Sequence, residues 1–165
     1  MHQTKKSLIL SYLGLIILLL GCSPKLIPAS SVKNGSISSY KYIYITPTSS
    51  LTSSSGATVN GQYFSSSKTV NPSDVIYGTL SKSGLIRLPE LKEELSEETL
   101  VVNYGESGRR SVGWGGYTIE VTIQFVSAKT NSLVCSCTAE GIGSTEADDI
   151  REAITRCLDK LIEKD

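Results

Sequence analysis

The sequence predicts a single α+β domain: a mostly antiparallel four-stranded sheet with two helices packed on one face, in the order β-α-β-β-β-α. Three patterns predict it. Apolar and polar residues alternate over 117–127, as in a strand with one covered face. Apolar residues recur every three or four positions over 150–161, as in a helix packed on a core. A helix start at Asn71-Pro72 separates the first strand from the others.

The first 21 residues predict a lipoprotein signal peptide. Lys5 and Lys6 precede an apolar run over 8–20, which is shorter than the roughly 20 residues of a membrane-spanning helix. The run ends in Leu-Leu-Gly-Cys at Cys22, which resembles the bacterial lipobox, where the thiol is acylated and the preceding peptide is removed. This resemblance implies a covalent lipid on Cys22. The alternative is an ordinary signal peptide, or a short anchor, that leaves Cys22 free.

Residues 22–39 are polar and contain two prolines, which predicts a lipidated, flexible tether in front of a domain over 40–165. Within that domain, residues 46–70 are mostly serine, threonine and glycine, which predicts a long loop or a disordered segment. Asn60-Gly61 favours the positive φ angles of a two-residue turn, so a small exposed hairpin is the alternative for part of this stretch.

The first strand is expected over 40–45, where aromatic and β-branched residues occupy both faces, as in a strand inside a sheet. Its tyrosines at 40, 42 and 44 are expected to pack in the core with their hydroxyls at the rim, rather than to form a stacking platform. In the following helix, Asn71 caps the start, Pro72 suits the first position, and Gly84 ends it in the left-handed conformation.

The rest of the chain continues the α+β pattern. Ser144 or Thr145 caps the last helix, and the acidic residues in its first turn are stabilised by the helix dipole. The other elements expected are an extended segment at 85–88, a short surface helix at 89–98, and strands at 99–104, 117–127 and 132–140.

Composition limits the function. The chain has 16 basic and 16 acidic residues, and loss of Lys5 and Lys6 leaves 14 and 16, so a nucleic-acid partner is not expected. The single histidine, His2, is lost with the signal peptide. The mature chain therefore has no Ser-His or Cys-His pair and no histidine metal site. These absences predict a protein that is not an enzyme and has no cofactor beyond the lipid on Cys22.

Three cysteines remain after the signal peptide, namely Cys135, Cys137 and Cys157. Residues two apart on a strand share a face, and Cys157 belongs to the apolar stripe of the last helix, so all three thiols are expected on one side of the sheet. Three interpretations stay open: buried small apolar side chains, one disulfide from Cys157 to Cys135 or Cys137, or a thiol-based redox or metal site.

The glycine-rich segment 105–116 is predicted to be a loop between two strands. It holds Arg109, Arg110 and Trp114, which are residue types that often anchor binding surfaces, so these three are candidate partner-binding residues. The alternative is a long hairpin loop whose Trp114 covers the sheet.

Several motifs together resemble a family of small Gram-negative, Bacteroides-type outer-membrane lipoproteins of unknown function. They are Leu-Leu-Gly-Cys at 19–22, Tyr-Lys-Tyr-Ile-Tyr at 40–44, Asn-Pro-Ser-Asp at 71–74, Val-Asn-Tyr-Gly-Glu at 102–106 and Thr-Glu-Ala-Asp-Asp-Ile-Arg at 145–151. The element order is also similar to that of envelope-assembly lipoproteins, including accessory lipoproteins that activate peptidoglycan synthases. The family supplies no catalytic residues.

These resemblances imply a lipid-anchored protein at the outer membrane that faces the periplasm, since Ser23 after Cys22 is not the aspartate of inner-membrane retention. The function expected is a non-enzymatic binding or scaffolding module whose partner is an envelope protein or is related to peptidoglycan. The alternative is a thiol-based redox or metal-handling envelope protein that uses Cys135, Cys137 and Cys157.

Overall fold

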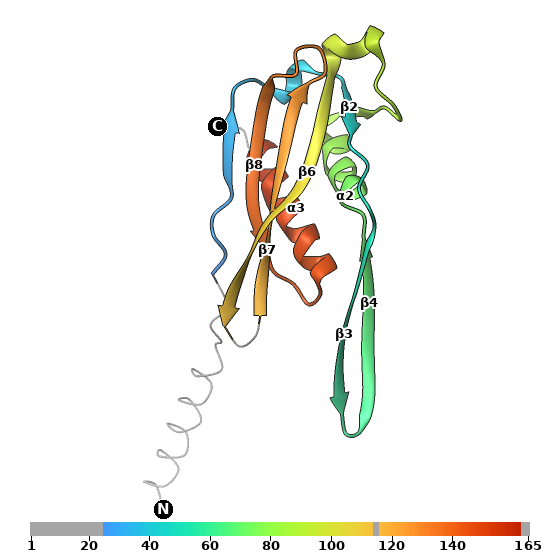
Figure 1. The fold of residues 1–165 in the computed structure, drawn as a ribbon, viewed down its shortest axis with the longest axis vertical. Coiled ribbons are helices and arrows are strands. Elements are labelled where there is room, and N and C mark those ends of the chain that lie inside the picture. Colours follow the sequence, from blue (N-terminus) through green and yellow to red (C-terminus); the bar gives the residue numbers. More distant parts are fainter. Residues whose placement is uncertain (1–24, 114–115, 163–165) are drawn as a thin grey trace, which may run out of the picture.

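The main sheet has six strands, and the predicted four-stranded, mostly antiparallel sheet is wrong. The computed structural model describes residues 25–113 and 116–162. The strands of the main sheet lie in the order β1-β8-β7-β6-β2-β5 (Figure 1). They are β1 (Ser30–Lys33), β2 (Tyr42–Ile45), β5 (Ile86–Arg87), β6 (Thr99–Gly113), β7 (Gly116–Ser127) and β8 (Leu133–Gly141).

The sheet is mixed because β2 pairs in parallel with both β5 and β6, whereas the pairs formed by β6, β7, β8 and β1 are antiparallel. The chain between β2 and β5 contains a helix, and a crossover of this kind returns the chain in the same direction. The interior position predicted for β2 is confirmed, since it lies between β6 and β5.

The edge strand β1 corrects the predicted tether. Ser30 to Lys33 pair with Thr138 to Cys135 of β8, so this part of 22–39 belongs to the sheet. An edge strand needs backbone partners on one side only, and Val32 remains 54% exposed. A search for apolar alternation does not detect such a strand.

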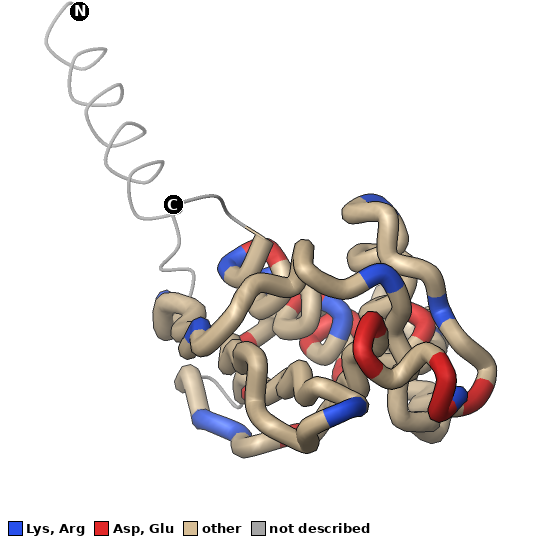
Figure 2. The backbone as a smooth tube through the Cα atoms, turned by 90° about the horizontal axis from the view of Figure 1, so that it is seen from above, with Lys and Arg blue, Asp and Glu red and all other residues tan. Residues whose placement is uncertain are grey.

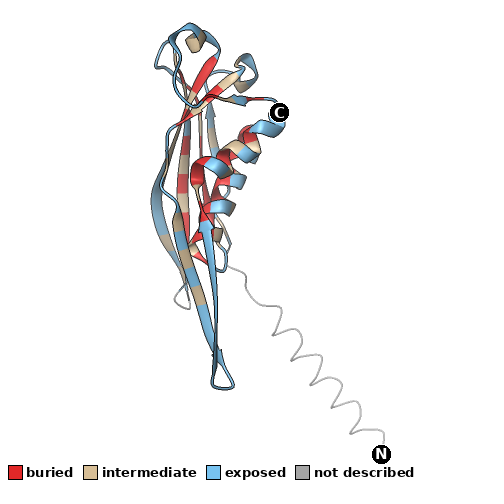
Figure 3. Cartoon of the chain, turned by 90° about the vertical axis from the view of Figure 1, so that its right-hand side faces the viewer, coloured by how far each residue is buried: buried red, intermediate tan, exposed pale blue. Residues whose placement is uncertain are grey.

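The loop predicted over 46–70 is also wrong from Leu51 onward. This stretch contains β3 (Leu51–Val59) and β4 (Gln62–Val70), which pair as a separate two-stranded sheet. Asn60 and Gly61 form the turn with φ angles of 51° and 77°, as the Asn-Gly pair indicates. The hairpin extends away from the rest of the molecule, and most of its residues are exposed (Figures 1 and 3).

Two α-helices in the described part of the chain lie on the same side of the main sheet, as predicted (Figures 1 and 3). Helix α2 (Pro72–Leu80) has Asn71 as its cap, and Gly84 ends the following 3-10 turn, η2 (Ser81–Ser83), at φ +85°. Helix α3 (Glu146–Ile162) starts beside Thr145, whose carbonyl accepts from the Asp148 and Asp149 amides. Two further 3-10 turns are η1 (Ile37–Ser39) and η3 (Glu93–Glu98).

The core lies between the helices and one face of the sheet. The alternation predicted for β7 is confirmed there, since Ile119, Val121, Ile123 and Phe125 have no exposed surface. Against them pack fully buried side chains of α2 and α3, including Ile76, Leu80, Ile154 and Leu158. The opposite face of the sheet, here called the open face, carries the alternate and more polar residues.

Candidate functional site

Cys22 and Trp114, the predicted lipidation site and one predicted binding residue, lie outside the described residues. The predicted loop over 105–116 is wrong for the part that the structure describes. Strand β6 continues to Gly113 and pairs with β7, with register shifts near Ser107 and Val112. Glycines at 105 and 108 therefore sit in a strand rather than in a loop.

The two predicted binding arginines point to opposite faces of β6 because they are neighbours in a strand. Arg109 pairs with Glu146 at the start of α3, and its guanidinium lies 5.2 Å from the centre of the Tyr117 ring. Arg110 lies on the open face and pairs with Glu140. The structure therefore does not bring Arg109 and Arg110 together, and it gives both an ion pair within the chain.

Glu140 of β8 is the centre of a polar cluster that sequence reasoning missed. Its carboxylate accepts hydrogen bonds from Arg110 Nε at 2.7 Å and Arg110 Nη2 at 2.6 Å. It also accepts from Thr118 Oγ1 at 3.2 Å and from the Ile27 amide at 2.9 Å. The residue is only 3% exposed. The Arg110 hydrogen bond is the main reason that the pKa of Glu140 falls to about 2, with the Ile27 and Thr118 hydrogen bonds acting in the same direction.

This Glu140 cluster holds the N-terminal segment against the domain. Arg110 Nη2 donates to the Lys25 carbonyl at 3.3 Å, and Arg156 of α3 donates to the Ile27 carbonyl at 2.9 Å. Together with β1, these contacts fix the chain from its first described residue, so the flexible tether predicted over 22–39 is wrong from Lys25 onward. Cys22 lies three positions before Lys25, a distance of about 11 Å at full extension.

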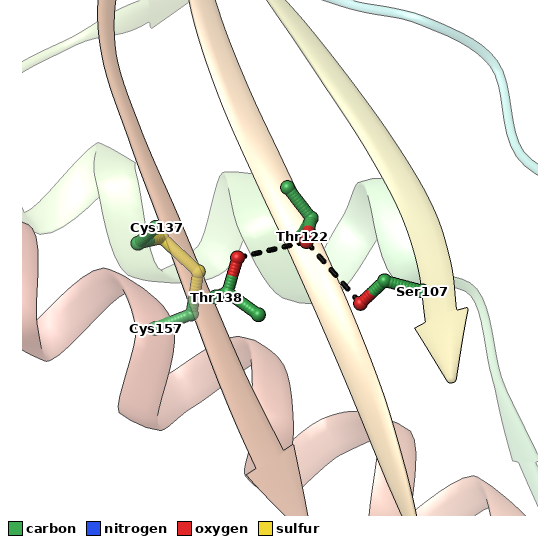
Figure 4. Close-up of a disulfide and its surroundings, with 5 residues drawn as sticks. All are labelled: Ser107, Thr122, Cys137, Thr138 and Cys157. Carbon is green, nitrogen blue, oxygen red and sulfur yellow. Dashed lines mark hydrogen bonds between the residues drawn. A yellow bond between two sulfur atoms is a disulfide. The ribbon is translucent and has the colours of Figure 1, made fainter. Parts of the chain in front are cut away.

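The thiols adopt two of the states left open by the sequence. Cys137 of β8 and Cys157 of α3 form a disulfide, with Cα atoms 5.3 Å apart (Figure 4). Cys135 is a free thiol with 1% exposure, and burial raises its pKa to about 11. A thiol with that pKa carries almost no thiolate at neutral pH, so it is a poor nucleophile and a poor metal ligand.

No group of three or more His, Cys, Asp or Glu side chains within 25–113 and 116–162 is placed to hold a metal ion. Cys135 instead borders a hollow of about 680 Å³ between η1 and the ends of α2 and α3. Its apolar lining includes Ile37, Leu80, Leu85 and Leu161, and its polar rim includes Asn34 and Ser83.

The open face carries a row of hydroxyl groups across three strands. Thr122 of β7 donates to Ser107 of β6 at 3.2 Å and shares a 2.8 Å hydrogen bond with Thr138 of β8 (Figure 4). Gln124 is exposed beside this row, and Tyr42 and Tyr44 are half-buried on the same face of β2. In the view of Figure 2, lysine and arginine are interspersed with aspartate and glutamate. The open face is suited to contacts through hydroxyl, amide and aromatic groups.

No family model and no curated protein matches this chain. Among solved structures, the chain is similar to the PelC dodecamer of Paraburkholderia phytofirmans. A single-residue variant of that protein aligns with 83% of this chain and 98% of its own, at 12% identity and a TM-score of 0.48. A second PelC crystal form covers 82% of this chain and 96% of its own, at 12% identity and a TM-score of 0.45. At these values the similarity carries no argument about function.

Across the described residues, no helix is both long enough and apolar enough to span a membrane.

Proposed function

We propose that this protein is a lipid-anchored, non-enzymatic binding or scaffolding module of the cell envelope, held at the outer membrane and facing the periplasm. The observation that carries the proposal is the attachment of Lys25 and Ile27 to the Glu140 cluster. With the chain fixed so soon after Cys22, an acylated Cys22 would hold the folded domain directly at the bilayer. A lipid at this position would therefore set where the domain works and which way it faces.

The disulfide between Cys137 and Cys157 supports an envelope location, because disulfides persist in oxidising compartments such as the bacterial periplasm. It also takes two of the three thiols away from the thiol-based alternative. The remaining thiol of Cys135 is buried and protonated at neutral pH. The structure thus favours a structural role for these cysteines.

The open face is the proposed binding surface. Its tyrosines, hydroxyls and amides suit a partner that is rich in hydroxyl or amide groups, such as an envelope protein or a peptidoglycan fragment. Arg109 and Arg110 act in this account mainly within the chain, through Glu146 and Glu140.

Photo-crosslinking in intact cells tests the proposal. A photoreactive residue at Gln124, which is exposed on the open face, is expected to give discrete adducts with an envelope component. The matched control is Lys82, which is exposed on η2 away from the open face and should give none. Equal, diffuse labelling from both positions would contradict a binding role for the open face.

A further inference from the structure

The β3–β4 hairpin ends in an exposed apolar tip, which we define as residues 57–64. Val59 is 54% exposed, Tyr63 71% and Phe64 59%. Isolated apolar residues on a surface need no explanation, but three large ones around a single turn form a patch that indicates a contact.

The base of the hairpin is fixed, whereas the tip projects. Ser53 Oγ accepts a hydrogen bond from the Ala147 amide at 2.9 Å, and Lys68, which pairs with Ser53 in register, forms a 2.7 Å ion pair with Asp148. Beyond these contacts, about six residues of each strand extend roughly 20 Å to the turn. Figure 1 shows this part of the hairpin clear of the main sheet and the helices.

The tip is apolar on both faces of the hairpin. Residues opposite each other in an antiparallel pair share a face, so Phe64 lies on the same side as Ala57 and Val59. Tyr63, opposite Thr58, lies on the other side, where its ring occupies the space left by the missing side chain of Gly56. A flat protein surface covers one face of a ribbon, whereas a lipid interface surrounds both.

The hairpin also lacks charge. No lysine, arginine, aspartate or glutamate occurs from Thr46 to Ser67. Moving such a segment among lipid headgroups does not require desolvation of an ionised side chain, which is the largest cost of bringing protein into a bilayer.

The tip and the start of the described chain lie toward the same end of the molecule. In Figure 1 the hairpin turn is at the lower end of the described chain, and the blue start of that chain lies below β1, in the lower half of the molecule and away from η3. The hairpin turn reaches further in that direction than the start of the described chain does (Figures 1 and 3). If Cys22 is embedded in a bilayer through its lipid, the tip is therefore positioned to meet that same bilayer.

We propose that the hairpin tip inserts Val59, Tyr63 and Phe64 into the interface of the phospholipid bilayer to which Cys22 is anchored. This inference rests on the proposed lipid anchor. Aromatic side chains favour the membrane–water interface, where the ring is in an apolar environment and the tyrosine hydroxyl remains hydrated. The free edges of β3 and β4 keep backbone groups that need water, so only the tip enters and the Ser/Thr-rich stem stays outside.

A second contact point would give the domain a fixed orientation. A lipid at one point leaves a body free to rotate, whereas an anchor and a distant hairpin tip together define how the domain stands on the membrane. The open face would then be presented at a constant height above the bilayer.

Fluorescence quenching in vesicles tests the insertion. The full chain, purified with its lipid, is placed in phosphatidylethanolamine–phosphatidylglycerol vesicles that contain phospholipids brominated on the acyl chain. Tryptophan is introduced by Tyr63→Trp at the tip or by Ser67→Trp on the same face of the stem, each with Trp114→Phe so that one tryptophan reports. The two positions are roughly 13 Å apart along the strand.

The tip tryptophan is expected to lose at least about half of its emission in brominated vesicles and to shift to shorter wavelength, because the quencher and the apolar environment lie at the interface. The stem tryptophan is expected to be unaffected. Near-ultraviolet circular dichroism of both variants checks that the domain is folded.

The outcomes separate this inference from the proposed anchor. Mass spectrometry of the same sample first establishes whether Cys22 is acylated, and a chain without lipid contradicts the proposed function. An acylated chain whose tip tryptophan is no more quenched than the stem tryptophan overturns the insertion alone. If neither tryptophan is quenched and the tips of two copies can be crosslinked to each other, the insertion is also overturned. The tip would then be a contact between two protein chains.

Discussion

At the scale of single residues, Glu140 connects four separate segments of the described chain. It joins β8 to Arg110 of β6, to Thr118 of β7 and to the backbone at Ile27, which lies 113 residues earlier in the chain. Local sequence patterns predict caps and turns, and Asn71, Gly84 and Thr145 act as expected. They contain no information about partners this far apart, so the Glu140 cluster could not be predicted.

The Glu140 ion pair predicts an acid-sensitive contribution to stability. A carboxyl whose pKa is lower in the folded chain stabilises the fold above its unfolded pKa, and that stability is lost as the pH falls toward the folded pKa of about 2. Glu140→Gln should therefore reduce the free energy of unfolding at pH 7 by roughly 2 kcal/mol, and this difference from the unsubstituted chain should shrink between about pH 5 and 2. Urea unfolding of the two chains at several pH values measures the loss of stability at pH 7 and its decrease at lower pH.

Asp148→Asn is the matched control, because the hydrogen bond from Lys68 is the main cause that lowers the pKa of Asp148 to about 2 as well. Only Glu140→Gln should accelerate hydrogen exchange of the Ile27 amide, which donates to Glu140. Equal exchange at Ile27 in the two variants would mean that Glu140 does not hold the N-terminal segment.

At the scale of elements, the main errors of prediction concern strands that bury little. Strands β6, β7 and β8 were predicted at least in part, since their alternation reflects a covered face. Strand β1 and the β3–β4 hairpin are held chiefly by backbone pairing, so their polar residues resemble a tether and a loop. Only the Asn60-Gly61 turn indicated a hairpin, because the backbone conformation required there favours those two residues.

The packing of β8 on α3 predicts a strict requirement for glycine at 141. A Cβ there would overlap the Asp149 carbonyl oxygen and lie 2.6 Å from the Ala153 amide nitrogen, and both belong to the backbone of α3. Gly141→Ala should therefore lower the free energy of unfolding by about 2–4 kcal/mol. Gly105→Ala is the matched control, since a Cβ at Gly105 meets nothing within 4 Å and should change stability by less than about 0.5 kcal/mol.

Thermal or urea unfolding of the two alanine variants measures this difference. A Gly141→Ala chain as stable as the Gly105→Ala chain would show that β8 and α3 are further apart than described. The sequence alone did not single out Gly141, because the close approach involves a helix that follows it in the chain.

At the scale of the whole molecule, the features near one end form a consistent set. Glu140 binds the N-terminal segment to the domain, and the hairpin tip projects toward the same end of the molecule (Figures 1 and 3). The helices cover only one face of the sheet, so the open face remains uncovered by them (Figures 1 and 3). The sequence predicted an anchor followed by a flexible arm. The structure instead attaches the chain to the domain by Lys25, so an anchor at Cys22 would control the position and the orientation of the domain together.

The most direct test of this account is intact-mass spectrometry of the chain purified from membranes, together with sequencing of its N-terminal peptide. We expect a chain that begins at Cys22 and carries acyl chains on that residue, and a Cys22→Ser chain that lacks this added mass. A native chain that retains residues 1–21, or one that begins at residue 22 with no added lipid, would contradict it.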